Sequence, residues 1–498
     1  MVALAAALYL PTIGHDFVID DAYYIADNDA VTRGAPLADY FFDRSTTASR
    51  ADFTWQSYRP VRTVAFRALA AAFGARPLPF AAANLALYAL AIALFAALAL
   101  RVAGDRAAAL AATALFALLP VHVEPVAYAS ALGDQLSLVF QLLAFAAAVR
   151  AIVTPRLAAV AALASLAAAA LAMGAKEMAV TEGPILAAGA ACAWRSLGRD
   201  ARRRAVAVVA AHAALTVGFL VLRTHVIGAV GQGAITSLTA RIAVRAIPIY
   251  LWKYLAVIAA PLGHAAAYSA VPLSRARAAV AWLGVVAVAV ALWRARRTTV
   301  GPALTFAAAW FALSLIPVLH VVPLLAYYAD RFAYVPSVGA ALAVAVALAA
   351  AGRWRRVAFV AAGALAAIYA VAVPLEARAW RSELTLWRHA VDVQPGAALA
   401  QSNLGITLLR AHAPAEALVH LQAAARLSGG GPATSMQIAL ALEELGRYDE
   451  AIAAARASLA EEDTSAGRAI LARITAKAKS APPEPPELLE PPAPPPRP

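Results

Sequence analysis

Two adjacent carboxylates, Asp20 and Asp21, follow the first apolar segment of the chain, in the sequence FVIDDAYYIADN at residues 17–28. One interpretation is a solvated loop that marks the end of this segment. The other is catalysis, because a buried carboxylate can act as a general base that takes a proton from a hydroxyl nucleophile. The type and position of these two residues therefore leave a structural and a chemical role open.

Basic side chains stand beside apolar segments in three further motifs. They are Arg59, Arg62 and Arg67 in SYRPVRTVAFR (57–67), Lys176, next to Glu177, in MGAKEMAVTEGP (173–184), and Arg331, next to Asp330, in YYADRFAYVPSVG (327–339). The neutral explanations are contact with lipid headgroups, pairing with nearby carboxylates and an aromatic belt. The alternative is a phosphate site, since a guanidinium group binds phosphate in a bidentate manner and a lysine retained between apolar segments can bind it too.

A polar stretch, LPVHVEPVAYASALGDQ at residues 119–135, separates two apolar segments and contains His122, Glu124 and Asp134. A His-x-Glu pair is a weak metal signature, and no cluster in the chain has the spacing of metal ligands, so we predict no metal site. Polar residues between membrane segments are tolerated where they line a cavity, which is the interpretation we favour.

The motifs share one chemistry, namely carboxylates that can activate an acceptor and cations that can hold an anion. Displacement of a sugar from a polyprenyl phosphate needs both. Negative charge builds up on the departing phosphate, and fixed cations stabilise that charge in the transition state.

The composition shows what kind of element must position these residues. Hydrophobic residues make up 62% of the 498 residues and charged residues 14%, and the mean hydropathy is +0.69. Soluble domains contain about 45–50% apolar and about 25% charged residues. The difference excludes a cytosolic enzyme, a disulfide scaffold and an intrinsically disordered protein. The single cysteine, Cys192, cannot form an internal disulfide and gives no information about the redox compartment.

Ten apolar segments are long enough to cross a bilayer as helices. They fall near 81–100, 105–121, 131–150, 157–174, 178–194, 205–222, 278–294, 301–319, 337–352 and 357–374. We interpret residues 1–14 as an eleventh, shorter span, because they have neither the basic start nor the cleavage motif of a signal peptide. A further apolar stretch at 246–262 contains Pro248 and Pro261, and we expect it to be re-entrant or interfacial.

The net charge of +13 is carried by short basic runs between apolar segments, such as those at 195–204, 293–297 and 353–356. This pattern is typical of cytoplasmic loops in membrane proteins and not of a nucleic-acid-binding face. The preference for arginine over lysine indicates a high-GC bacterial genome. We therefore expect a multi-pass protein of a bacterial inner membrane, with the polar motifs and the C-terminal region facing the periplasm or exterior.

The chain changes character after its last apolar segment. Glu416 in PAEALVHLQAAARL and Glu450 in YDEAIAAARASL occupy equivalent positions 34 residues apart, which is the period of tetratricopeptide helix pairs. The predicted parts are a transmembrane domain at 1–375 with its first outer loop at 15–80, a tetratricopeptide-repeat domain at 376–478, and a proline-rich disordered tail at 479–498.

In this order, the motifs resemble those of the transmembrane and tetratricopeptide-repeat protein O-mannosyltransferases, which belong to the GT-C glycosyltransferase superfamily. The resemblance rests on FVIDDAYYIADNDAV, SYRPVRTVAFR, LPVHVEPVAYASALGD, GAKEMAVTEGP, ADRFAYVPSVGAAL and, at the join to the repeats, WRSELTLWRHAVDVQPGAALAQSNLG. It implies an all-α, polytopic GT-C fold of about eleven transmembrane helices, followed by the repeats.

The resemblance further implies an inverting transfer of a sugar, often mannose, from a polyprenyl- or dolichyl-phosphate to a protein hydroxyl, without a cofactor. Carried over, Asp21 becomes the general base and Asp20 supports it, while Arg59, Lys176 and Arg331 become candidate ligands of the lipid phosphate. The residues expected to line the cavity and orient the substrates are Tyr58, His122, Glu124, Glu177 and Asp330.

Two departures from the family matter. The family's Glu-Arg pair is Asp330-Arg331 here, and the repeat region is shorter than in the animal proteins. The bacterial composition favours a polyprenyl-phosphate carrier, and the acceptor is a protein serine or threonine, a lipid or a glycan. The repeats would then present or select a protein acceptor.

Two other classes compete with a transferase. A transporter or flippase of lipid-linked sugars would use the same outer cations. It would also carry polar groups along the cytoplasmic half of its path, and often internal repeats in its spans, and the sequence shows neither feature. A membrane-anchored tetratricopeptide scaffold without catalysis would not need the charged motifs that this chain retains.

Overall fold

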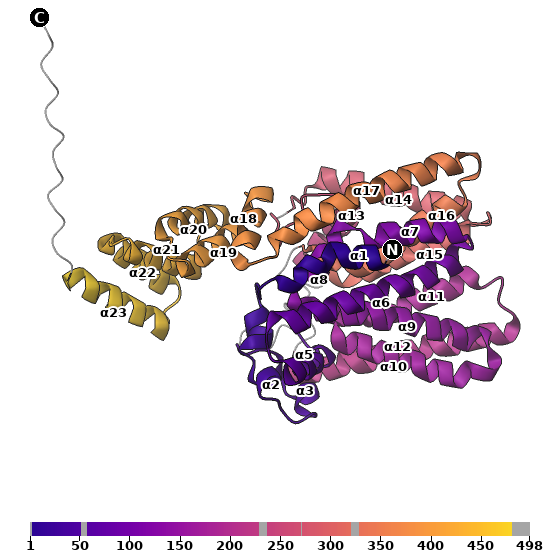
Figure 1. Cartoon of the computed structure of the whole chain (residues 1–498), viewed down its shortest axis with the longest axis horizontal. Helices are drawn as coiled ribbons and strands as arrows, with labels where there is room; N and C mark the ends of the chain where they lie inside the picture. The colour runs from indigo at the N-terminus through magenta and orange to yellow at the C-terminus, as the bar shows by residue number, and fades with distance from the viewer. Residues whose placement is uncertain (1, 51–56, 229–236, 270, 320–327, 481–498) are drawn as a thin grey trace, which may run out of the picture. The chain divides into compact units, whose positions relative to one another are not determined.

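The computed structural model describes residues 2–50, 57–228, 237–269, 271–319 and 328–480 (Figure 1). Every regular element in these residues is helical, which confirms the predicted all-α class. Internal contacts divide the chain into two units, Met1–Gln394 and Pro395–Pro498, and each unit is described by itself. Most of the predicted proline-rich tail lies outside the described residues.

The first unit is a bundle of long apolar helices that run side by side (Figure 1). Within the described residues, nine helices are long and apolar enough to cross a membrane, and ten if one bent pair is a single span. The helices of this unit that carry these spans are α6 (Pro77–Ala103), α9 (Leu132–Val153), α10 (Ala158–Ala175), α12 (Arg199–Ile227), α13 (Ser237–Ala259), α14 (Arg275–Ala295), α15 (Gly301–Leu315), α16 (Tyr334–Ala349) and α17 (Arg355–Ala379). The multi-pass architecture predicted from hydropathy is confirmed.

Two shorter apolar helices accompany them. Helix α1 (Val2–Tyr9) and the turn η1 (Leu10–Gly14) form one apolar segment at the N-terminal end. Helix α11 (Glu182–Ala193) packs against α12 and α15.

The bent pair begins with α7 (Arg106–Ala117) and continues through η4 (Pro120–His122) into α8 (Val123–Ala127), with a bend of 53°. A residue that precedes proline is disfavoured in the helical conformation. Leu119, which precedes Pro120, has φ −60° and ψ 119° and so leaves the helix. The bend carries the polar stretch at 119–135 across the end of the bundle.

We expected Pro248 to interrupt the apolar stretch at 246–262. Helix α13 instead runs through this proline without a break. It is long and apolar enough to be a span by length and composition. The end of α12 and the residues that follow α13 nevertheless lie at the same end of the bundle. Phe219, near the end of α12, packs on Tyr58, and His264, after α13, bonds to Asp330 near the start of α16.

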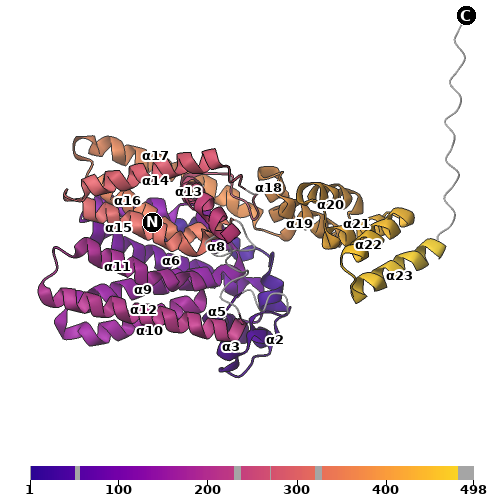
Figure 2. The ribbon, with the colours of Figure 1, turned by 180° about the vertical axis from the view of Figure 1, so that it is seen from behind.

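The polar motifs collect at one end of the bundle, which we call the polar end. Figures 1 and 2 show α2 (Asp29–Thr32), α3 (Asp39–Phe42) and α5 (Pro60–Phe73) together at this end. They are joined there by α8 and by the short turns η5 (Ala129–Ala131), η7 (Glu177–Thr181) and η9 (Asp330–Ala333).

The arginine-rich turns lie at the opposite end, which we call the basic end. Arg355 at the start of α17 forms a two-bond ion pair with Asp105 before α7, at 2.8 and 3.1 Å. Arg204 of α12 donates to the carbonyl oxygen of Ile152 in α9 at 2.9 Å. The charge segregation expected from the sequence is therefore a property of the folded bundle.

The last helix of the first unit, α18 (Glu383–Val393), packs on α17, so this unit extends past the predicted boundary at residue 375. The described part of the second unit, up to residue 480, contains five helices. They are α19 (Ala398–Arg410), α20 (Pro414–Ser428), α21 (Pro432–Glu444), α22 (Tyr448–Glu461) and α23 (Ser465–Ser480).

A 34-residue repeat is visible in the packing of the second unit. Helices α19 and α21 begin at Ala398 and Pro432, and α20 and α22 begin at Pro414 and Tyr448. Small residues occupy equivalent buried positions, since Ala417 and Ala451 are both fully buried. At Gly405, an added Cβ would lie 2.6 Å from Leu421, so the close approach of α19 and α20 requires glycine.

Candidate active site

Asp21 is fully buried at the polar end and is held by three donors. Its Oδ2 accepts a hydrogen bond from the backbone N–H of Val18 at 3.0 Å, and its Oδ1 accepts from the N–H and the hydroxyl of Ser130 at 2.7 and 2.5 Å. Burial raises the pKa of Asp21 to about 7, although these donors act in the opposite direction. The Asp21 carboxylate thus ties the first loop to η5.

Asp20 has different surroundings, although it is the adjacent residue. It follows Ile19, whose φ of +55° is rare for a β-branched residue and is maintained only by the packing around it. The Asp20 side chain is partly exposed. Burial raises the pKa of its carboxyl above the ordinary range, while Arg331, Arg62 and a hydrogen bond from Tyr128 act in the opposite direction.

Arg59 and Glu177 form a bidentate ion pair between the start of α5 and η7. Nε and Nη2 of Arg59 each donate to one carboxylate oxygen of Glu177 at 2.7 Å. Burial opposes ionisation of Glu177, but Arg59 lowers the pKa of this carboxyl to about 2. The Arg59 side chain is 22% exposed, so a ligand can still contact it.

Lys176 does not pair with the adjacent Glu177 but with a carboxylate on another helix. Its Nζ donates to Oδ1 of Asp134 on α9, and the two side chains are only 4% and 8% exposed. Lys176 is therefore neutralised by Asp134 and not by Glu177. This pair fixes the end of α10 against the start of α9.

The adjacent residues Asp330 and Arg331 also bond to different partners. Arg331 donates to Glu124 of α8 from its backbone N–H, at 2.9 Å, and from its guanidinium group. Asp330 accepts from the hydroxyl of Tyr268 at 2.7 Å and lies 2.9 Å from Nδ1 of His264. Burial alone would lower the pKa of His264, but the facing Asp330 carboxylate raises it above the ordinary value.

Arg62 also lies in the site, although it is not among the phosphate ligands expected from the family resemblance. Its Nε and Nη2 atoms are buried and have no hydrogen-bond partner among the described residues. Its guanidinium carbon lies 4.3 Å from the ring centroid of Tyr24 and 5.4 Å from that of Phe66. Burial lowers the pKa of Arg62 to about 10, and Arg59 acts in the same direction. The spacing of three residues from Arg59 is the signal in the sequence that could have selected it.

Two predicted site residues take part in packing. His122 is fully buried, with Nδ1 2.9 Å from the hydroxyl of Tyr88 and Nε2 2.8 Å from Oγ of Ser337. The Tyr58 hydroxyl donates to the carbonyl oxygen of Phe41 in α3 at 2.9 Å. Both residues position the polar end through their contacts with protein groups.

The ion pairs are linked into one electrostatic cluster. Arg331 interacts with both Asp20 and Lys176, and Arg62 interacts with both Asp20 and Arg59. Each of Arg59, Lys176 and Arg331 contacts its own carboxylate, and Arg62 adds a positive charge without one. The arrangement combines a partly exposed carboxylate with partly exposed guanidinium groups, which is what proton removal beside a bound anion requires.

The polar end does not resemble a metal centre. No group of three or more His, Cys, Asp or Glu side chains in the described part of the chain could hold a metal ion. Its carboxylates are instead bonded to basic, hydroxyl and backbone donors.

Three relatives share part of this sequence. The chain is 36% identical over 147 residues to the protein O-mannosyl-transferase Tmtc1 of Drosophila melanogaster, a match that covers 29% of this chain and 17% of that protein. It is 33% identical over 126 residues to the protein O-mannosyl-transferase TMTC2 of Mus musculus and of Homo sapiens, over 25% of this chain and 15% of those proteins. The resemblance to this family is confirmed over these stretches. The chain spans less than a fifth of the length of these relatives.

No protein-family profile matches the chain. Among solved structures, the crystal structure of ArnT from Cupriavidus metallidurans bound to undecaprenyl phosphate aligns with 91% of this chain and 79% of that chain. The TM-score is 0.42 and the sequence identity is 15%.

Proposed function

We propose that this protein is an integral-membrane inverting glycosyltransferase that moves a sugar, mannose in the first instance, from a polyprenyl-phosphate carrier to a hydroxyl group. The observation that carries the proposal is the cluster at the polar end, in which the partly exposed Asp20 lies among Arg331, Arg62 and Tyr128. The similarity to protein O-mannosyl-transferases supports the reaction class.

In the proposed reaction, the acceptor hydroxyl attacks the anomeric carbon from the face opposite the phosphate. The bond from this carbon to the phosphate oxygen breaks, and its electron pair leaves with the lipid phosphate. The hydroxyl proton passes to a carboxylate. A single displacement inverts the anomeric configuration, and the enzyme needs no cofactor.

We assign the base to Asp20, with Asp21 as its support, which exchanges the roles expected from the motif. Asp21 already accepts three hydrogen bonds and has no exposed surface. A general base must come within hydrogen-bond reach of the proton it removes. Only the partly exposed Asp20 can meet a substrate without unfolding the loop.

We assign the lipid phosphate to Arg59 and Arg331. Their side chains are 22% and 26% exposed, whereas that of Lys176 is 4% exposed and Arg62 is 1% exposed. Exposed guanidinium groups can exchange water for phosphate oxygens and form bidentate bonds. Lys176 and Arg62 then contribute positive charge from buried positions without contacting the phosphate. This charge stabilises the negative charge on the leaving phosphate.

The segregation of charge supports one orientation in the membrane. We propose that the basic end faces the cytoplasm and that the polar end, with the first loop, faces the periplasm or exterior of a bacterial cell. The polyprenyl chain would remain in the bilayer while its phosphate reaches Arg59 and Arg331. The helical repeats of the second unit would select a protein acceptor with a serine or threonine hydroxyl.

The test is sugar transfer by purified protein in nanodiscs. Radiolabelled polyprenyl-phosphate-mannose is mixed with a membrane extract from a deletion strain, and wild type, Asp20→Asn and Asp21→Asn are compared. We expect label in a protein or lipid band with the wild type and a loss of at least about 100-fold for Asp20→Asn, the range for general base catalysis. The folded fraction of Asp21→Asn should retain measurable transfer.

The outcomes separate the parts of the proposal. Near wild-type turnover by Asp20→Asn, with no turnover by folded Asp21→Asn, would return the base to Asp21. Donor binding without transfer of mannose or any other polyprenyl-linked sugar would overturn the enzyme class.

A further inference from the structure

Two adjoining cavities lie at the basic end, at the other end of the bundle from the polar motifs. The first, of about 640 Å³, lies between α6 and α9. The second, of about 520 Å³, extends between α6, α9, α11 and α15. Both are lined by Leu98, Arg101, Phe145, Val149 and Val153, so the two cavities adjoin, and together we call them the hollow.

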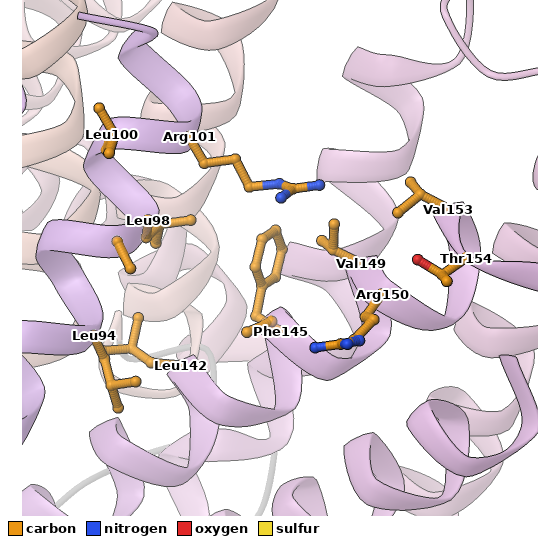
Figure 3. Close-up of a pocket in the computed structure, with 12 residues that line it drawn as sticks. Leu94, Leu98, Leu100, Arg101, Leu142, Phe145, Val149, Arg150, Val153 and Thr154 are labelled. Atoms are coloured by element: carbon orange, nitrogen blue, oxygen red, sulfur yellow. The ribbon is translucent and has the colours of Figure 1, made fainter. Parts of the chain in front are cut away.

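The walls of this hollow are apolar and its rim is cationic. Leu94, Leu98 and Leu142 line the first cavity, and Figure 3 shows the Arg101 and Arg150 side chains on either side of Phe145 and Val149. Arg195 borders the second cavity. The hollow therefore combines a hydrocarbon surface with guanidinium groups.

The arginines at the rim are not neutralised by the protein. In the described residues, Arg101, Arg150 and Arg195 form no ion pair with a carboxylate, and all three are exposed. Arg355 at the same end differs, because it is paired with Asp105. An unpaired cationic rim is complementary to an anionic ligand.

The dimensions of the hollow fit a lipid chain. Its lining on α9 runs from Leu142 to Val153, and a helix rises about 1.5 Å per residue, which gives a groove of about 16 Å along the helix axis. A hollow of this kind beside membrane-spanning helices is filled by hydrocarbon rather than water, since its walls offer water few partners.

We propose that this hollow binds an anionic phospholipid from the leaflet at the basic end, with its phosphate on Arg101 and Arg150 and an acyl chain along Leu94, Leu98 and Leu142. Basic pockets between membrane helices bind acidic headgroups in this way. The bound lipid fills the space between α6 and α9 and so stabilises the bundle from the end opposite the active site. This proposal does not depend on the transfer reaction.

The test compares lipid retention and thermal stability of the full-length protein in nanodiscs of phosphatidylcholine with and without phosphatidylglycerol. Arg101→Gln/Arg150→Gln is compared with Arg156→Gln/Arg199→Gln, which removes two exposed arginines from the same end that border neither cavity. Ala146→Trp fills the first cavity from an exposed position and keeps both arginines.

We expect phosphatidylglycerol to copurify with the wild type, as detected by mass spectrometry, and to raise its melting temperature above that in phosphatidylcholine. Arg101→Gln/Arg150→Gln should weaken retention by about fivefold per arginine, since one basic side chain near an anionic lipid is worth about 1 kcal/mol. Ala146→Trp should weaken it as well, while Arg156→Gln/Arg199→Gln should not.

Equal losses in the two double variants would mean attraction by the general charge of this end and would overturn the site. Retention by Ala146→Trp equal to that of the wild type would also overturn it, because the acyl groove would then be unused. Displacement of the lipid by millimolar inorganic phosphate would show a site for a free anion instead. Melting curves in phosphatidylcholine establish that each variant is folded.

Discussion

At the scale of single residues, the adjacent pair Asp20 and Asp21 shows how two identical side chains acquire different surroundings. Asp21 meets three donors in a fully buried position, and Asp20 stays partly exposed next to Arg331. The same divergence occurs at Lys176 and Glu177, which bond to Asp134 and Arg59. In each pair, the fold separates neighbours that the sequence places together.

The raised pKa of Asp20 predicts the acidic limb of the pH profile. A general base acts only when it is ionised, so activity is lost as the pH falls through its pKa. Because burial raises this pKa above 3.8, the loss should occur at a higher pH than for an ordinary aspartate. The measurement is kcat/KM against pH in nanodiscs. The folded fraction of Asp21→Asn should keep the same limb, and a limb that moves with this variant would point to Asp21.

The exposure of Arg331 predicts a defect in donor capture. Arg331→Ala removes a guanidinium group that a phosphate can contact. It also takes the charged donor from the buried Glu124, which keeps its hydrogen bond from the backbone N–H at position 331. We expect the KM for the polyprenyl-phosphate sugar to rise more than the KM for the acceptor, by about tenfold or more, given the strength of bidentate phosphate contacts. Arg67→Ala is the comparison, since Arg67 donates to the carbonyls of Val31 and Thr32 within the loop. An unchanged donor KM in Arg331→Ala would remove this residue from the phosphate site.

At the scale of elements, the site depends on close approach between helix ends. Gly133 of α9 lies against the end of α10, and an added Cβ would be 2.8 Å from the carbonyl oxygen of Ala175 and 3.0 Å from Cδ of Arg62. Ala175 directly precedes Lys176. The spacing of α9, α10 and α5 therefore sets the positions of Arg62 and Lys176.

Gly133→Ala is expected to destabilise the protein by about 1–3 kcal/mol, the usual effect of overpacking, and to reduce transfer in the fraction that folds. Gly363→Ala on α17 is the matched control, because an added Cβ there meets nothing within 4 Å. Alanine favours helix over glycine by about 1 kcal/mol, so the control should be neutral or stabilising. Thermal unfolding and the transfer assay check both variants. Equal effects of the two substitutions would show that the contact of α9 with α10 does not position the site.

At the scale of the whole molecule, the first unit segregates its charges between two ends. Acidic and basic side chains form a cluster at the polar end, while arginines dominate the turns at the basic end. Lys253 adds a cation near the polar end, 4.0 Å from the ring centroid of Tyr328. Such an asymmetry fixes orientation in a membrane, because positive loops are retained in the cytoplasm.

Orientation can be measured by cysteine labelling. In a Cys192→Ala background, Leu37→Cys places a thiol on an exposed position in the first loop, and Arg199→Cys places one at the basic end. We expect a membrane-impermeant maleimide to label the first variant in intact spheroplasts and the second only after permeabilisation. The reverse pattern would place the polar end in the cytoplasm and would exclude a periplasmic acceptor.

Local sequence patterns specify the helical class, most of the membrane-spanning helices and the positions of the polar motifs along the chain. These features follow from local properties, because a run of about 20 apolar residues must be a helix in lipid, whatever its neighbours. The short basic runs between apolar segments likewise predicted which turns lie at the same end of the bundle. The predicted span at 178–194 is instead the 12-residue helix α11, which is not among the nine helices long and apolar enough to cross a membrane in the described residues. The 34-residue period of the second unit was visible as Glu416 and Glu450 before any packing was known.

The partners of the charged residues, in contrast, depend on the folded arrangement of the helices. Asp134 and Lys176 are 42 residues apart, Arg59 and Glu177 are 118 apart, and Glu124 and Arg331 are 207 apart. No local pattern specifies such pairs, since each depends on how whole helices pack and where their ends meet. For the same reason, the sequence could not show that Asp21 is enclosed by Ser130 while Asp20 remains accessible. Burial and long-range contacts, which distinguish a structural carboxylate from a reactive one, arise only when the chain is folded.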